Sequence, residues 1–119
     1  MYTRTRNIIL GGLVLLLTAC GQQYKAEKAV EAFVDANAIE PSEIAHRDFA
    51  DIGTTRHISD SLIDVMRHRA APLFKKDIPY PPKPSGDLIY LRMRYIHKGD
   101  TLQNTFYLDN ELKEVVAFK

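Results

Sequence analysis

The sequence predicts an α+β domain in which two helices pack on an antiparallel sheet. Apolar residues recur with helical spacing over residues 24–38 and again, over a shorter stretch, after residue 59. The last third of the chain instead alternates apolar and polar residues in the way that half-buried strands do. Helices and strands that occupy separate parts of a chain are typical of the α+β class.

Residues 1–19 have the features of a secretory signal. Arg4 and Arg6 form a positive segment, and a mainly aliphatic run over residues 8–19 follows them. As a helix this run rises only about 18 Å, against a hydrocarbon core of about 30 Å, which disfavours a permanent membrane span. We therefore expect residues 1–19 to be a signal peptide that is cleaved.

The end of this run, Leu17-Thr18-Ala19-Cys20, resembles the lipobox of bacterial lipoproteins. The resemblance implies a diacylglyceryl thioether on Cys20, cleavage before that residue and acylation of the freed amine. Two or three acyl chains, at about 0.8 kcal/mol per buried methylene, anchor a protein stably in a membrane. The alternative is an ordinary buried cysteine at the end of a hydrophobic helix.

The resemblance also bears on location. It implies a protein of the cell envelope that is anchored by lipid. Gly21 follows the cysteine, in place of the aspartate that retains lipoproteins of enterobacterial type in the inner membrane. Where two membranes are present, the outer membrane is therefore favoured.

Cleavage before Cys20 leaves residues 20–23 as lipid attachment site and tether, and residues 24–119 as a single α+β domain. Loss of Arg4 and Arg6 leaves 14 basic residues against 15 acidic ones, a net charge near −1. This balance does not support nucleic-acid binding, which usually shows a basic surface. Lipidation of the only cysteine leaves no thiol for a disulfide, so we expect one compact apolar core.

An amphipathic helix is predicted over residues 24–38. Its apolar face consists of Ala26, Val30, Phe33 and Val34. Its charged face consists of Lys25, Glu27, Lys28, Glu31 and Asp35. Asn37 and then Pro41 indicate its end. We expect the apolar face to lie across the apolar face of the sheet.

Residues 41–58 fit neither helical nor strand spacing well, and we predict two short strands there, the clearer over residues 54–58. A second, shorter helix is predicted after Ser59, which can act as its N-cap. Its apolar side contains Leu62, Ile63, Met66 and Ala70, and Pro72 follows it. The proline-rich segment 78–86 then predicts an extended connector.

The C-terminal residues predict a three-stranded antiparallel meander over residues 88–97, 101–109 and 112–118. A two-residue turn at Gly99-Asp100 would place Leu91 opposite Leu108 and Arg92 opposite Tyr107, which gives one apolar and one polar face. A three-residue loop would mix the two faces. Residues 115–118 are apolar on both sides, so we expect that strand to be central or covered on both faces.

The order of elements resembles the cystatin-like and nuclear-transport-factor-like folds. The resemblance covers most of residues 24–119 and implies a helix packed across an antiparallel sheet. It rests on architecture and on no motif, so it implies no functional residues.

Motifs for known chemistry are absent from the sequence. It has no G-x-S-x-G, H-E-x-x-H, glycine-rich phosphate loop or calcium loop. The four histidines, His46, His57, His68 and His97, are dispersed, and we expect no metal site. Asp60 and Asp64 lie four residues apart, but N-cap and solvent roles explain them better than acid–base catalysis. We expect no cofactor and no enzymatic activity.

The polar face of the predicted meander is the candidate binding face. It contains Tyr90, Arg92 and Arg94 on one strand and Gln103, Thr105 and Tyr107 on the next. Arginine and tyrosine are enriched at interface hot spots. The alternative is an ordinary solvated sheet face, in which Arg92 stacks on Tyr107.

The sequence therefore favours a membrane-anchored binding module that contacts another envelope protein or an anionic glycan. A structural accessory subunit, permanently docked in an envelope complex, is the alternative. A hydrolase or hydrolase inhibitor comes third.

Overall fold

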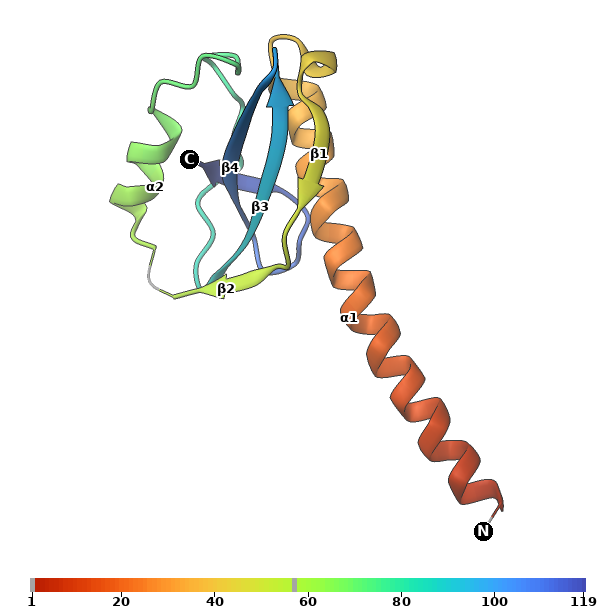
Figure 1. The fold of residues 1–119 in the computed structure, drawn as a ribbon. Coiled ribbons are helices and arrows are strands. Elements are labelled where there is room, and N and C mark those ends of the chain that lie inside the picture. Colours follow the sequence, from red (N-terminus) through yellow and green to blue (C-terminus); the bar gives the residue numbers. More distant parts are fainter. Residues whose placement is uncertain (1, 57) are drawn as a thin grey trace.

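The computed structural model describes residues 2–56 and 58–119, with the side chains of residues 20–56 and 58–119. In chain order its elements are α1 (Tyr2–Asn37), the 3-10 helix η1 (Pro41–Glu43), β1 (Ala45–Phe49), β2 (Gly53–Thr55), α2 (Asp60–Arg67), β3 (Leu88–His97), β4 (Asp100–Leu108) and β5 (Val115–Phe118) (Figure 1). The chain is α+β, with two helices packed on an antiparallel sheet, as predicted. Among the described residues, no helix is both long enough and apolar enough to cross a membrane.

The helix predicted over residues 24–38 is the C-terminal part of α1, which ends at Asn37. Ala26, Val30 and Val34 of the predicted apolar face have no exposed surface and belong to the core. Phe33, its fourth residue, is half-buried and packs against the same cluster. At the end of the helix the side-chain amide of Asn37 donates a hydrogen bond to the Phe33 carbonyl at 3.0 Å. The N-terminal half of α1 extends away from the sheet (Figure 1).

The sheet has the strand order β1-β3-β4-β5, and all neighbours are antiparallel. The predicted C-terminal meander is β3-β4-β5. The two short strands predicted within residues 41–58 are β1 and β2, which both pair with β3. The second covers Gly53–Thr55 rather than 54–58, and His57 lies outside the described residues. A bulge interrupts β1 near His46, whose φ is 52°.

The prediction of a two-residue turn at Gly99-Asp100 is wrong, because the turn lies one residue earlier in the chain. Lys98 and Gly99 form the two-residue loop, because His97 pairs with Asp100. Both loop residues have positive φ, 49° and 86°, as a type I′ turn requires. Leu91 consequently pairs with Phe106 and Arg92 with Thr105, a shift of two residues along β4. Since side chains alternate with period two, the predicted division into two faces is unchanged.

Each face of the sheet carries an apolar cluster, so the single core expected from the sequence is divided by the sheet. The larger cluster joins the apolar face of α1 to Leu91, Met93, Phe106 and other residues of the sheet. The smaller one joins Ile63 and Met66 of α2 to a group from the opposite face, namely Leu88, Tyr107, Val116 and Ala117. All residues of β5 are buried, which confirms that this strand is covered on both faces.

The second helix, α2, begins as predicted. The Ser59 hydroxyl accepts a hydrogen bond from the Leu62 amide at 3.1 Å, which makes Ser59 the N-cap. Leu62 itself is 47 % exposed, so the buried side of α2 is narrower than predicted. At its C-terminal end, Arg67 donates to the carbonyls of Val116 and Pro81 at 2.9 and 2.8 Å. These bonds hold α2 against β5 and against the proline-rich connector.

Candidate functional site

On the face of the sheet opposite α1, α2 covers the region around Tyr107 and Ala117. Beyond that helix, polar side chains form two rows across the strands. One row consists of Asp48, Arg94 and Gln103, and the other of Arg92, Thr105 and Lys119. We call these six residues the open face. Five of them are exposed and Thr105 is half-buried.

Positive charge dominates the open face. Arg92, Arg94 and Lys119 contribute three cations, and Asp48 is the only acid among the six residues. Within residues 20–56 and 58–119, neither Arg92 nor Arg94 takes part in an ion pair. Their charge is therefore available to an incoming anionic group.

The two tyrosines of the predicted binding face are not part of this surface. Tyr107 is only 8 % exposed, because it packs in the cluster that includes Ile63 and Met66 of α2. Tyr90 is half-buried beside the same cluster, and a Cβ on its cross-strand partner Gly53 would clash with the Tyr90 ring. The expectation that both tyrosines are exposed is corrected, whereas Arg92 and Arg94 are exposed as expected.

The cations of the open face nevertheless lie near these rings. The Arg92 guanidinium is 5.6 Å from the centroid of Tyr90, and the Lys119 ammonium is 6.0 Å from that of Tyr107. Tyr90, and not Tyr107 as expected, is thus the aromatic neighbour of Arg92. Lys119 was not predicted on this face, although its alternation with the buried Phe118 could have placed it there.

Cys20 is exposed and lies within α1. Residues 20–23 continue the helix without interruption, so Gln23 is only about 4.5 Å further along its axis. The Gln23 side chain is bonded to the loop between β1 and β2: its amide donates to the Ala50 carbonyl and its oxygen accepts from the Ile52 amide, both at 2.9 Å. Contact with the domain thus begins three residues after the predicted lipid site.

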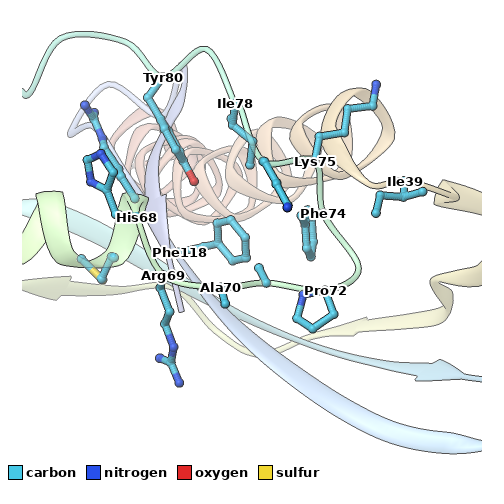
Figure 2. A pocket seen from close by; sticks show the side chains of 14 residues that line it. Ile39, His68, Arg69, Ala70, Pro72, Phe74, Lys75, Ile78, Tyr80 and Phe118 are labelled. Carbon is cyan, nitrogen blue, oxygen red and sulfur yellow. The ribbon is translucent and has the colours of Figure 1, made fainter.

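A cleft of about 490 Å³ lies between the end of α2 and the connector that leads to β3 (Figure 2). Its apolar lining consists of Ile39, Met66, Ala70, Ala71, Pro72, Phe74, Ile78, Tyr80 and Phe118. Its basic lining consists of Arg67, His68, Arg69, Lys75 and Lys76. Figure 2 shows the rings of Phe74 and Phe118 side by side, with Arg69 directed away from them.

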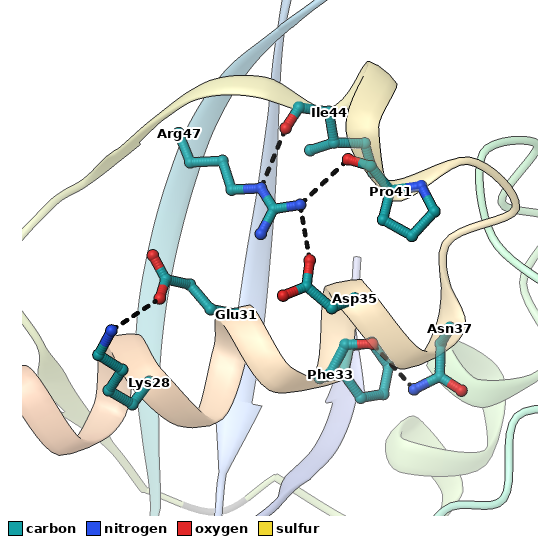
Figure 3. A network of polar contacts seen from close by, with 8 residues as sticks. All are labelled: Lys28, Glu31, Phe33, Asp35, Asn37, Pro41, Ile44 and Arg47. Atoms are coloured by element: carbon teal, nitrogen blue, oxygen red, sulfur yellow. Dashed lines mark hydrogen bonds and ion pairs between the residues drawn. The ribbon is translucent and has the colours of Figure 1, made fainter.

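The position of α1 is fixed at its C-terminal end by Arg47 of β1. The guanidinium donates to the carbonyls of Ile44 and Pro41 at 3.0 and 3.1 Å and to the Asp35 carboxylate at 2.9 Å (Figure 3). Arg47 is largely shielded, with 18 % of its side chain exposed. Arg47 and Gln23 therefore attach α1 to the sheet at two points along the helix.

The histidines do not converge in the part of the chain that is described. His68 bonds to the Asp64 carbonyl at 2.8 Å, and His97 lies 3.3 Å from the Glu43 carboxylate. His46 is exposed at the bulge in β1. No group of three or more potential metal ligands is found among the described residues.

The two aspartates of α2 have separate environments. Asp60 lies in the first turn of the helix, where the helix dipole favours a carboxylate. Asp64 pairs with Lys83 at 2.7 Å, and this hydrogen bond lowers the pKa of its carboxyl group. A carboxylate held in its ionised form is poorly suited to act as a general acid.

Comparisons of the chain with protein-family models, with curated proteins and with solved structures gave no match. The function is therefore inferred from the open face, the cleft and the segment around Cys20.

Proposed function

We propose that this protein is a lipid-anchored binding module of the cell envelope. Cys20 carries the lipid, and the open face captures an acidic surface of another envelope protein or an anionic glycan. The observation that carries the proposal is the pair of exposed arginines, Arg92 and Arg94, which have no ion-pair partner among the described residues.

The charge distribution supports an anionic partner. Cations that project from the same face of a sheet create a local positive potential, which raises the rate of encounter with an anionic group. Arginine also binds carboxylates and phosphates with two parallel hydrogen bonds, which adds geometric specificity. Gln103 and Thr105 lie in the same rows and offer further hydrogen-bonding groups.

The polarity of the open face favours a reversible binder over a permanently docked subunit. Permanent interfaces are more apolar than transient ones. Among the described residues, six large apolar side chains are exposed: Tyr24, Ile39, Leu62, Val65, Ile96 and Leu102. Of these, only Ile96 alternates onto the same face of the sheet as Arg92 and Arg94.

The contact between Gln23 and the loop after β1 supports the placement near a membrane. Gln23 is the third residue after Cys20, so a lipid on that cysteine would hold the domain at the bilayer surface with little freedom. Partners within the envelope would then meet the open face at short range.

The test uses the full chain in cells, with a photoreactive amino acid in place of Gln103. We expect irradiation to produce an adduct, and Arg92→Ala with Arg94→Ala to weaken its formation about thirtyfold, since an interface arginine can contribute 2 kcal/mol or more. Peptides in the adduct identify a protein partner. Loss of the adduct on glycan digestion identifies a glycan.

The matched control is Lys25→Ala with Lys28→Ala, which also removes two exposed cations but from α1. This variant should keep the adduct. The free energy of unfolding of both double variants should lie within about 0.5 kcal/mol of that of the parent chain, because substitutions of exposed residues usually change stability by no more than this. An adduct that survives loss of both arginines would refute the assignment of the open face.

A further inference from the structure

The cleft between α2 and the connector differs from the open face in having an apolar floor. Phe74 and Phe118 are 4 % and 5 % exposed, and their ring centroids lie 4.6 Å apart. Ile39, at the rim, is 58 % exposed. Pro72, which also lines the cleft, is exposed as well. Covering apolar surface is favourable by about 25 cal/mol per Å², so the exposed Ile39 and Pro72, more than the buried rings, favour an apolar group. The volume, about 490 Å³, is within the usual range for small-molecule sites.

The charged residues that line this cleft are all basic. Lys75 and Lys76 are exposed, and neither forms an ion pair within the described residues. The Lys75 ammonium donates only to a backbone carbonyl, that of Ala36, at 3.2 Å. Asp77, the next residue in the chain, does not line the cleft. The rim therefore carries positive charge without an acidic side chain to neutralise it.

The wall of the cleft adds a neutral hydrogen-bond donor. Burial raises the pKa of Tyr80 to about 12, despite the opposing effect of Arg67, whose guanidinium lies 4.8 Å from the ring centroid. The tyrosine hydroxyl therefore stays protonated. Figure 2 shows it directed into the cleft, toward Phe118. In this position the hydroxyl can donate to an oxygen anion.

We infer that the cleft binds an amphipathic anion, a molecule with an aliphatic chain and a carboxylate or phosphate group. The chain would lie over the floor formed by Phe74 and Phe118 and cover the exposed Ile39 and Pro72. The anionic group would lie at the rim near Lys75 and Lys76. This site is separate from the open face, and the inference does not depend on the function proposed for that face.

The ligand is not the lipid expected on Cys20. Ile39 follows the C-terminal end of α1, and Cys20 lies about 26 Å before that end along the helix axis. Acyl chains attached at Cys20 would leave the helix about five turns before the residues that line the cleft. The cleft is therefore open to an amphiphile that arrives from elsewhere.

The test is photolabelling of the full chain in membranes. The probes are dodecanoic acid, dodecyl phosphate and dodecyltrimethylammonium, each with a diazirine on its chain, and adducts are mapped by mass spectrometry. We expect one or both anions to label the cleft between residues 66 and 80, and excess unlabelled dodecanoate to compete. The ratio of the two anions shows whether carboxylate or phosphate is preferred. We expect the cation to label the cleft at least about tenfold less, because it places like charge beside two lysines.

Two variants test the two parts of the site. Lys75→Glu with Lys76→Glu should reduce labelling about tenfold by removing the charge-assisted contacts. Ala70→Trp should block the cleft from its exposed side. The control Lys25→Glu with Lys28→Glu makes the same charge change on α1 and should leave labelling unchanged. A thermal melt of each variant shows that it is folded.

Three results would overturn the inference. One is equal labelling of the cleft by the cationic probe. Another is labelling that dodecanoate does not compete. The third is labelling of the cleft that persists in both the Ala70→Trp chain and the Lys75→Glu, Lys76→Glu chain while each remains folded.

Discussion

The side-chain oxygen of Gln23 accepts a hydrogen bond from the backbone amide of Ile52 at 2.9 Å. The same side chain donates to the Ala50 carbonyl, so one glutamine satisfies both a donor and an acceptor of the loop between β1 and β2. This arrangement joins α1 to the sheet three residues after the residue expected to carry the lipid.

Gln23→Ala should therefore loosen this loop and cost about 1 to 2 kcal/mol in stability, the net contribution of two hydrogen bonds. Hydrogen exchange of the Ile52 amide measures the effect directly, and we expect its protection to fall. Gln22→Ala is the matched control, because Gln22 is exposed on the same turn of the helix. Unchanged protection of Ile52 in the Gln23 variant would contradict the contact.

Cys20→Ser should leave an uncleaved or mislocalised precursor, because the lipoprotein signal peptidase acts on the lipid-modified thiol. The measurement is membrane fractionation of cells that are fed a labelled fatty acid. Serine is close to cysteine in shape and replaces the nucleophilic sulfur with a hydroxyl oxygen. Unchanged lipid labelling of the serine variant would refute the lipoprotein proposal.

Phe33→Ala should cost about 3 to 5 kcal/mol, a large part of the stability of a small domain. The centroid of the Phe33 ring lies 5.6 Å from that of Phe118 and 5.9 Å from those of Phe106 and Tyr80. Removal of the ring therefore leaves a cavity between α1, the sheet and the connector. Denaturant unfolding gives the loss. Tyr24→Ala removes a 64 % exposed ring from the same helix and should cost little. A loss below about 1 kcal/mol for Phe33→Ala would place that ring outside the core.

Lys98→Asn should stabilise the hairpin by about 0.5 to 1 kcal/mol, because asparagine adopts positive φ more readily than lysine. Lys98 has a φ of 49° at the first position of the β3–β4 turn. Lys98→Ala is the control, since it removes the same charge without easing the backbone. Equal melting temperatures for the two variants would show that the turn conformation does not limit stability.

Alkaline pH should destabilise the protein partly through Tyr80. Its pKa is about 12 in the folded chain and near 10 in the unfolded one, so the unfolded state loses its proton first. The stabilising contribution of the neutral phenol is present below about pH 10 and is lost as the pH rises towards 12. Over this pH interval, the melting temperature of the Tyr80→Phe variant should fall less steeply than that of the parent chain.

Tyr24→Phe provides the control for this experiment, because Tyr24 is exposed. The melting temperature of this variant should equal that of the parent chain at every pH. Tyr95 also has a raised pKa through burial, so Tyr80→Phe should reduce the alkaline loss without abolishing it. If the melting temperatures of Tyr80→Phe and of the parent chain fell equally with rising pH, the Tyr80 hydroxyl would be solvated in the folded protein.

Local patterns in the sequence were sufficient for most of the architecture. The spacing of Ala26, Val30 and Val34 predicted the face of α1 that is buried, because helical period and burial are directly linked. Ser59 predicted the start of α2, since a hydroxyl at that position satisfies a free backbone amide. The alternation in β3 and β4 predicted which side chains share a face.

The position of the hairpin turn could not be predicted in this way. A shift of two residues leaves the alternation of the strands unchanged, so the hydrophobic pattern fits both registers equally. Lysine is also not a residue that usually indicates positive φ, and Gly99 fits either turn. The choice of Lys98-Gly99 was made by the pairing of β3 with β4 as a whole.

The sequence by itself determined the fold class, the two faces of the sheet and the exposure of Arg92 and Arg94, because these follow from periods of 3.6 and two residues along the chain. Only the tertiary structure decided what covers each face. Tyr107 is buried because α2 returns across the sheet and packs Ile63 and Met66 on it. The cleft likewise exists because the chain between α2 and β3 brings Phe74 and Tyr80 beside Phe118, and a contact between such distant segments has no signature in any local pattern.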